Sequence, residues 1–71
     1  MMKTIESTMA GTVLNVLVNV GDEVKAGDTV AMLESMKMEI PIESSEAGVV
    51  AEVKASAGDF INEGDALIVL K

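Results

Sequence analysis

Lys37 is the residue whose type and setting best suit covalent chemistry. It stands inside residues 34–39, which read Glu-Ser-Met-Lys-Met-Glu. A lysine amine held at an exposed turn can enter the active site of another protein and form an amide with an activated acyl group. In that chemistry the lysine is a covalent substrate rather than a catalytic base. We therefore interpret Lys37 as an attachment point.

The rest of the catalytic inventory is small. The chain has no histidine, cysteine, tyrosine or tryptophan, and its five basic residues are all lysines. General acid–base catalysis would rest on carboxylates and lysines alone, and a structural zinc site lacks its usual ligands. A small hydrolase with paired carboxylates would need a pocket that so short a chain can hardly form. The sequence therefore favours a carrier over an enzyme.

The attachment point lies between two copies of one sequence. Residues 5–34 align without a gap to residues 42–71 at an offset of 37, and twelve of the thirty pairs are identical. Residues 35–41 join the copies, so we expect two similar halves with the joining turn at one end. The identical pairs are Ile5/Ile42, Glu6/Glu43, Ser7/Ser44, Ala10/Ala47, Gly11/Gly48, Val13/Val50, Val16/Val53, Gly21/Gly58, Asp22/Asp59, Gly27/Gly64, Asp28/Asp65 and Leu33/Leu70.

The elements that must position Lys37 are expected to be strands. Residues 13–20 and 49–54 alternate in side-chain type, and 29–33 and 66–70 are short apolar runs rich in β-branched residues. A helical turn over residues 34–39 is disfavoured by Pro41 and the flanking β-branched runs. Met9 and Met32 are predicted to belong to the core.

Glycine–aspartate pairs mark the turns between these strands. In turns, glycine supplies a positive φ and aspartate accepts backbone hydrogen bonds, so the pairs predict structural turns rather than calcium ligands. Each half then contains a short strand, around Val24 or Ile61. The fold class predicted is all-β, with two small antiparallel sheets packed face to face. The pairs are Gly21-Asp22, Gly27-Asp28, Gly58-Asp59 and Gly64-Asp65.

Length and charge restrict the partners. Seventy-one residues with a net charge of −7 indicate a single domain, residues 1–71, that repels nucleic acid and anionic membranes. There is no apolar run of membrane-spanning length and no signal-peptide pattern. We expect a cytoplasmic monomer with transient, electrostatically steered partners. Residues 1–4 should lie beside residue 71, at the end opposite residues 35–38.

Taken together, these motifs resemble a known family. The segments 11–13, 20–24, 27–28 and 33–39, with their second-half counterparts, are similar to the biotinyl domains of biotin carboxyl carrier proteins, and in particular to stand-alone bacterial biotin/lipoyl attachment proteins. The resemblance covers essentially the whole chain. It implies a flattened β-barrel, or barrel-sandwich hybrid, of two four-stranded antiparallel sheets with quasi-two-fold symmetry. The modified lysine would protrude from a hairpin.

The same resemblance implies the function. Lys37 would be biotinylated by a biotin protein ligase, and the biotinyl arm would carry a carboxyl group between biotin carboxylase and carboxyltransferase sites. Met36 and Met38 flank the lysine as in the family motif and suit contact with several partners. Glu34, Ser35 and Glu39 are possible docking residues for the ligase or the carboxylase, although the two glutamates also suit solubilising strand ends.

Some positions depart from the family pattern. Ser35 stands where the family commonly has alanine, and Thr8 and Ser45 stand where it often has proline. The extra thumb loop of some acetyl-CoA carboxylase carriers is missing, because residues 14–30 match their second-half copies without an insertion. The particular carboxylase that would use the arm is therefore left open.

Two alternatives are kept beside the biotin carrier. The first is a lipoyl carrier modified on Lys37 by a lipoate ligase; lipoyl domains more often show Asp-Lys-Ala around the lysine. The second is an unmodified barrel-sandwich interaction module. Such modules typically separate the two halves by a long helical hairpin, whereas seven residues separate them here.

Overall fold

The structure is a computed structural model that describes residues 2–71, and within that range it contains strands and turns without a helix. The all-β prediction is therefore confirmed. The strands are β1 (Lys3–Glu6), β2 (Gly11–Val16), β3 (Glu23–Val24), β4 (Thr29–Ser35), β5 (Met38–Glu43), β6 (Gly48–Val53), β7 (Phe60–Ile61) and β8 (Ala66–Leu70).

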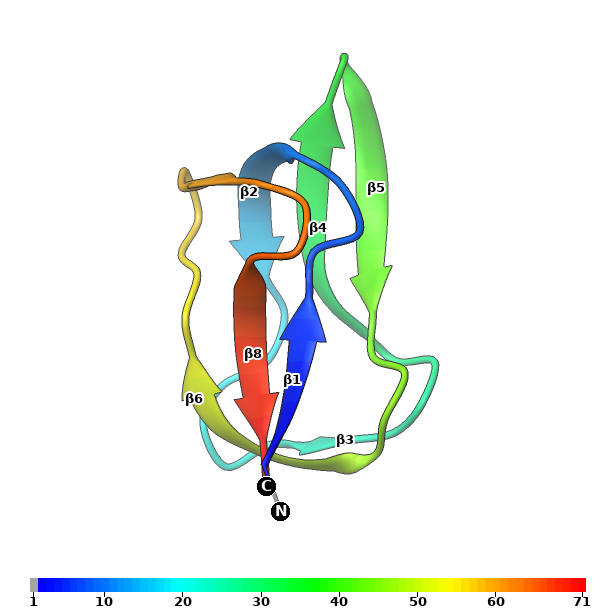
Figure 1. Cartoon of the computed structure of the whole chain (residues 1–71), viewed down its shortest axis with the longest axis vertical. Coiled ribbons are helices and arrows are strands. Elements are labelled where there is room, and N and C mark those ends of the chain that lie inside the picture. Colours follow the sequence, from blue (N-terminus) through cyan, green and yellow to red (C-terminus); the bar gives the residue numbers. More distant parts are fainter. Residues whose placement is uncertain (1) are drawn as a thin grey trace.

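These strands form two four-stranded antiparallel sheets. The pattern of the sequence predicted two antiparallel sheets and the family resemblance implied four strands in each, and both expectations are confirmed. One sheet has the order β1-β8-β6-β3 and the other the order β5-β4-β2-β7. Figure 1 shows the hairpin of β4 and β5 rising above the rest of the molecule. The short strands predicted around Val24 and Ile61 are β3 and β7.

The core lies between the two sheets and is aliphatic. Leu33 and Ile42 from one sheet and Leu67, Ile68 and Leu70 from the other are fully buried. Met9 packs against this cluster, as predicted. The prediction for Met32 was wrong: it is half-buried, because successive side chains of a strand point to opposite faces and its neighbours Ala31 and Leu33 occupy the inner one.

Four β-bulges interrupt the strands at equivalent positions of the two halves. The extra residue is Leu14 in β2 and Ala51 in β6, and it is Val30 in β4 and Leu67 in β8. Each pair is separated by 37 residues, so the repeat extends to the irregularities of the backbone. The bulge at Leu14 also corrects the uninterrupted alternation expected over residues 13–20, since a bulge adds one residue to one strand only.

The glycine–aspartate turns have the predicted structural role. The four glycines have φ between 89° and 97°, a conformation that favours glycine over any other residue. Each aspartate side chain accepts a hydrogen bond from the backbone N–H three residues earlier, at 2.8–3.0 Å. The donor–acceptor pairs are Asn19/Asp22, Lys25/Asp28, Ser56/Asp59 and Asn62/Asp65. Among residues 2–71, no cluster of three or more acidic side chains could hold a metal ion.

The chain ends lie opposite the hairpin tip. Lys3 pairs with Leu70 in the first sheet, and Figure 1 shows the start of β1 and the end of β8 at the far end of the long axis from the tip. The predicted position is therefore confirmed for residues 2–4 and 71, while Met1 lies outside the described residues. The extents are 34 × 19 × 18 Å. Within the described range, the structure offers no helix suited to crossing a membrane.

Candidate modification site on the β4–β5 hairpin

The hairpin that carries Lys37 has the shortest common connection. Ser35 pairs with Met38, so Met36 and Lys37 alone form the turn. Their φ values are 52° and 67°, as in a type I′ turn, which requires positive φ at both central residues and usually takes Asn-Gly. An L-residue in this conformation costs about 1–2 kcal/mol. The turn therefore places two strained, non-glycine side chains at the tip.

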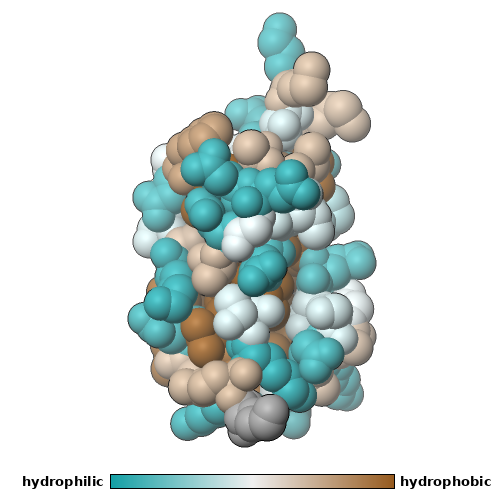
Figure 2. All heavy atoms as spheres, viewed as in Figure 1, coloured by the Kyte–Doolittle hydropathy of each residue, from teal (hydrophilic) through white to brown (hydrophobic). Residues whose placement is uncertain are grey.

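The side chains around the tip are largely in solvent. Met36 is 91% exposed and Met38 is 64% exposed, and Lys37 is exposed as well. Figure 2 shows the tip standing clear of the body, with a hydrophilic end beside more hydrophobic atoms. The ion pairs in the described part of the chain involve Lys3 and Lys54 rather than Lys37. The Lys37 amine is thus accessible to an incoming enzyme.

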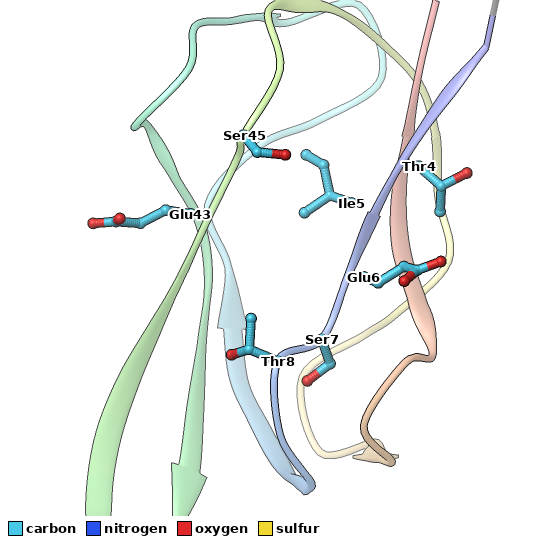
Figure 3. A pocket seen from close by; sticks show the side chains of 7 residues that line it. All are labelled: Thr4, Ile5, Glu6, Ser7, Thr8, Glu43 and Ser45. Atoms are coloured by element: carbon cyan, nitrogen blue, oxygen red, sulfur yellow. The ribbon is translucent and has the colours of Figure 1, made fainter.

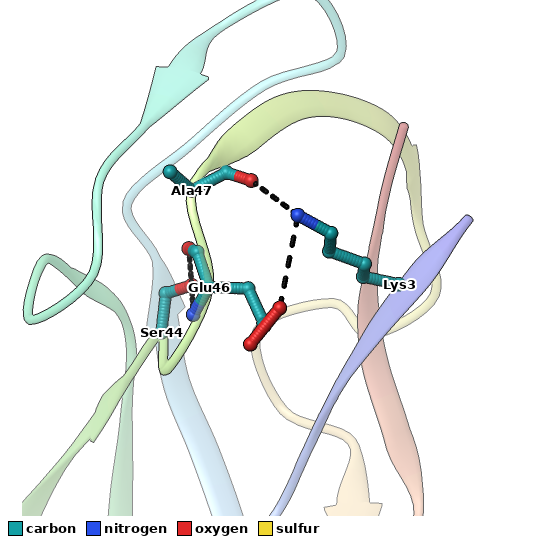
Figure 4. A network of polar contacts seen from close by, with 4 residues as sticks. All are labelled: Lys3, Ser44, Glu46 and Ala47. Atoms are coloured by element: carbon teal, nitrogen blue, oxygen red, sulfur yellow. Dashed lines mark hydrogen bonds and ion pairs between the residues drawn. The ribbon is translucent and has the colours of Figure 1, made fainter. Parts of the chain in front are cut away.

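Lys3 shows the contrasting case of an engaged lysine. Its Nζ donates a hydrogen bond to the Ala47 carbonyl oxygen at 3.1 Å and lies 3.7 Å from Oε1 of Glu46. The hydroxyl of Ser44 bonds to the same turn through the Glu46 backbone, as Figure 4 shows. Lys3 therefore ties β1 to residues 44–47, a structural task that Lys37 does not share.

Gly11 supports the base of the hairpin, and sequence reasoning did not assign it this role. A Cβ at Gly11 would lie 2.7 Å from the carbonyl oxygen of Glu34, closer than a side chain tolerates. Its repeat partner Gly48 stands in the same relation to Lys71, at 2.9 Å. The identity of this glycine pair in the repeat was the available signal that both halves need a close backbone approach here.

Two carboxylates flank the tip. Glu34 and Glu39 are directly opposite each other across the hairpin, and both are exposed. Like charges in this position destabilise a hairpin. Ser35, by contrast, is half-buried. The structure thus brings all six predicted site residues together, with Ser35 the least accessible of them.

Two surface cavities lie elsewhere. One of about 300 Å³ lies between β1 and residues 43–45. Figure 3 shows Ile5, Thr8 and Ser45 around this gap, with the Glu43 side chain pointing away. The other, of about 460 Å³, lies between residues 15–20 and 53–57. Neither is lined by residues 34–39, so Lys37 lies on a projecting tip and not in either cavity.

Comparison with known proteins agrees with this geometry. The sequence model of the biotin–lipoyl family, described as biotin-requiring enzyme, matches residues 3–70. The chain belongs to the biotin–lipoyl family.

Several bacterial members of the biotin–lipoyl family are similar in sequence. Biotinylated protein TB7.3 of Mycobacterium tuberculosis is 48% identical over 42 residues, 59% of each chain. The biotin/lipoyl attachment protein of Bacillus subtilis is 54% identical over 39 residues, 55% of this chain and 53% of that protein. The methylmalonyl-CoA carboxyltransferase 1.3S subunit of Propionibacterium freudenreichii is 60% identical over 35 residues, 49% of this chain and 28% of that subunit. The chain thus spans about three-fifths or less of the curated relatives it matches.

Solved structures confirm the biotin–lipoyl fold. The urea carboxylase of Kluyveromyces lactis superposes with a TM-score of 0.92 at 30% identity, over 100% of this chain and 6% of that enzyme. A single-chain, multi-domain long-chain acyl-CoA carboxylase superposes with a TM-score of 0.87 at 29% identity, over 96% of this chain and 7% of that enzyme. The flattened barrel of this family therefore also occurs as a small part of much larger carboxylases.

Proposed function

We propose that residues 1–71 form one carrier domain whose Lys37 is covalently biotinylated. The observation that carries the proposal is the Met36-Lys37 turn, which holds an exposed lysine side chain at the projecting tip of the hairpin. Attachment of biotin requires one accessible amine, so the residues present fit the group. Once bound, biotin supplies a ring nitrogen that carries a carboxyl group between a biotin carboxylase and a carboxyltransferase.

Each part of the tip has a task in this function. The Lys37 amine attacks the acyl carbon of biotinyl adenylate; the amide C–N bond forms, AMP leaves and the nitrogen loses a proton. Attack requires a neutral amine held in line with the acyl carbon, so the ligase must supply the base and the positioning. The two-residue turn holds the amine beyond the barrel, and the flexible lysine stem lets it visit separate active sites.

The flanking methionines provide the apolar surface around the amine. Met36 and Met38 are both mostly exposed, and their unbranched, polarisable side chains adapt to differently shaped surfaces. This property suits a carrier that must meet a carboxylase and a transferase in turn. Glu34 and Glu39 add negative charge at the strand ends, and Ser35 keeps a small side chain where β4 meets the turn.

The partners proposed are a biotin protein ligase, a biotin carboxylase and a carboxyltransferase. The name of one relative, a methylmalonyl-CoA carboxyltransferase subunit, supports the carboxyltransferase. The similarity to domains of two solved carboxylases supports a carboxylase partner. We place the chain in the cytoplasm, as a monomer that meets these partners transiently. Its charge of −7 favours partners with basic surfaces.

A lipoyl carrier is the second candidate. It is supported by the similarity to the biotin/lipoyl attachment protein of Bacillus subtilis, and it would use the same Lys37 with a lipoate ligase. The methionines on both sides of Lys37 favour biotin. An unmodified interaction module has less support, because residues 35–41 leave no room for the long insertion that such modules carry.

Mass spectrometry tests the proposal directly. The chain and its Lys37→Arg variant, which keeps the positive charge, are incubated with ATP, biotin and a bacterial biotin protein ligase. We expect one biotinyl group on the parent chain, mapped to Lys37, and none on the variant. A parallel reaction with lipoate and a lipoate ligase tests the second candidate. A folded chain that accepts neither group would contradict the carrier function.

A further inference from the structure

Phe60 is an exposed aromatic side chain without an internal structural role. It is the only aromatic residue of the chain, it lies on β7, and it is 66% exposed. The adjacent Ile61 points the other way and is buried in the core. The core is therefore completed without Phe60, which presents its ring to solvent.

Backbone pairing places Phe60 in line with the base of the hairpin. Phe60 pairs with Thr12, Thr12 pairs with Glu34, and Glu34 pairs with Glu39. Residues paired in this way share one face of a sheet, and this is the outer face because Val13, Leu33 and Ile61 occupy the inner one. We call these four residues the outer row. With neighbouring strands about 4.8 Å apart, the Phe60 backbone lies about 10 Å from that of Glu34.

The charge on this face has one sign. Strands β2, β4, β5 and β7 contain three glutamates, Glu34, Glu39 and Glu43, and no lysine or arginine. All three glutamates are exposed. The outer row therefore combines an apolar ring at one end with two carboxylates at the other, directly below the Met36-Lys37 turn.

The turn alone is too small to give an enzyme specific recognition of this domain. A specific interface covers about 800 Å² on each partner, and much of its energy comes from a few residues, aromatic ones above all. An enzyme that reaches Lys37 must therefore contact the body below the tip. The outer row offers the required aromatic group on the sheet that continues into the hairpin.

We propose that the outer row is the docking surface for the enzyme that attaches the cofactor to Lys37, with Phe60 as its apolar anchor. The chemistry of the outer row defines the partner. The partner enzyme presents an apolar pocket for the Phe60 ring and basic side chains opposite Glu34 and Glu39. This inference rests on the proposed function and adds to it the surface through which the ligase recognises the chain.

Steady-state biotinylation kinetics test the inference, with Val20→Ala as the matched control. Val20 is an apolar side chain of similar exposure, 64%. It lies near the chain termini, because Gly21 bonds to Val50, which pairs with Leu70. With a bacterial biotin protein ligase, Phe60→Ala should lower kcat/KM about tenfold, mainly through KM. Val20→Ala should leave both constants unchanged.

A competition experiment gives a second readout that does not depend on modification of the variant itself. Excess Lys37→Arg chain should inhibit biotinylation of the parent chain, and the double variant Lys37→Arg/Phe60→Ala should inhibit about tenfold more weakly. Circular dichroism establishes that both competitors are folded. Equal inhibition by the two, or a Phe60→Ala effect confined to kcat, would overturn the docking role.

The two proposals fail in different ways. If the parent chain is never modified, the proposed carrier function is contradicted, and so is the proposal that the outer row binds a ligase. If the parent chain is modified and Phe60→Ala behaves as Val20→Ala does, only the docking role of Phe60 is lost. In addition, Glu34→Gln/Glu39→Gln should weaken the dependence of kcat/KM on ionic strength, since rim charges act mainly through steering.

Discussion

Gly11 and the carbonyl oxygen of Glu34 are so close that a Cβ on Gly11 would lie only 2.7 Å from that oxygen. This contact fixes β2 against β4 just below the turn that holds Lys37. Gly11→Ala must therefore push the base of the hairpin away from the barrel. We expect a loss of about 1–3 kcal/mol in the free energy of unfolding, measured by denaturant titration.

Gly48→Ala is the matched control for this prediction. Its Cβ would meet the carbonyl oxygen of Lys71 at 2.9 Å, so a similar loss of stability is expected. Because Gly48 lies at the opposite end from the tip, folded Gly48→Ala should still be biotinylated at the parent rate. Folded Gly11→Ala should be biotinylated more slowly, and equal rates for the two variants would refute a special role of Gly11 at the hairpin.

The backbone at Lys37 predicts opposite effects on stability and function. Lys37 has a φ of 67°, and an alanine in its place keeps the strain of an L-residue in this conformation. A glycine relieves about 1–2 kcal/mol of strain. Part of this gain is lost because glycine makes the unfolded chain more flexible. Lys37→Ala should change stability by no more than about 0.5 kcal/mol, and Lys37→Gly should be more stable than Lys37→Ala by about 1 kcal/mol. We expect no biotinylation of either variant. The measurement is thermal unfolding of the two variants. A more stable alanine variant would contradict the positive φ and the backbone strain at Lys37.

The repeat allowed much of this fold to be predicted. Equivalent glycine–aspartate pairs at an offset of 37 located the turns, and the join between the copies located the tip. The bulges at Leu14 and Val30 were not predictable, because an extra residue leaves the side-chain types around it unchanged and is visible only in the pairing. The wrong prediction that Met32 belongs to the core has a related cause. In a run of apolar residues, the residue type does not show which side chains face the core and which face outward.

The candidate modification site and the proposed docking surface differ in how far the sequence alone could indicate them. Lys37 and its neighbours form a contiguous motif, so they could be read directly from the chain. The outer row could not, because Phe60 reaches Glu34 only through Thr12, a relation set by pairing between strands far apart in the sequence. Gly11 was missed for the same reason: its contact with Glu34 is created by sheet packing.

The register of the hairpin should matter for modification. One residue inserted between Glu34 and Met36 would lengthen the two-residue turn and reverse the faces of the side chains beyond it. We expect a folded protein that a ligase no longer modifies, as judged by intact mass. A matched insertion after Gly21, in a turn near the chain termini, should leave modification intact. Full biotinylation of the first insertion variant would show that ligases do not require the hairpin geometry.

The facing carboxylates predict a measurable gain of stability when one is neutralised. Glu39→Gln removes the repulsion from Glu34 and should stabilise the chain by a few tenths of a kcal/mol at low ionic strength. At 1 M salt the Debye length falls to about 3 Å, so the gain should largely disappear. Glu43→Gln is the control, because Glu43 pairs with the uncharged Thr29. Equal effects of the two variants on denaturant unfolding would show that net charge, and not the cross-strand pair, sets the effect.

The methionines of the tip should separate attachment from carrier turnover. Met36→Leu/Met38→Leu retains apolar side chains but replaces flexible thioethers with branched, stiffer groups. We expect the double variant to accept biotin as the parent chain does, because the amine and the turn are unchanged. It should then support slower carboxyl transfer with a partner carboxylase, because branched side chains adapt less well to several surfaces. The measurement is turnover with equal amounts of biotinylated parent and variant. Unchanged turnover would assign Met36 and Met38 no part in contacts with the carboxylase.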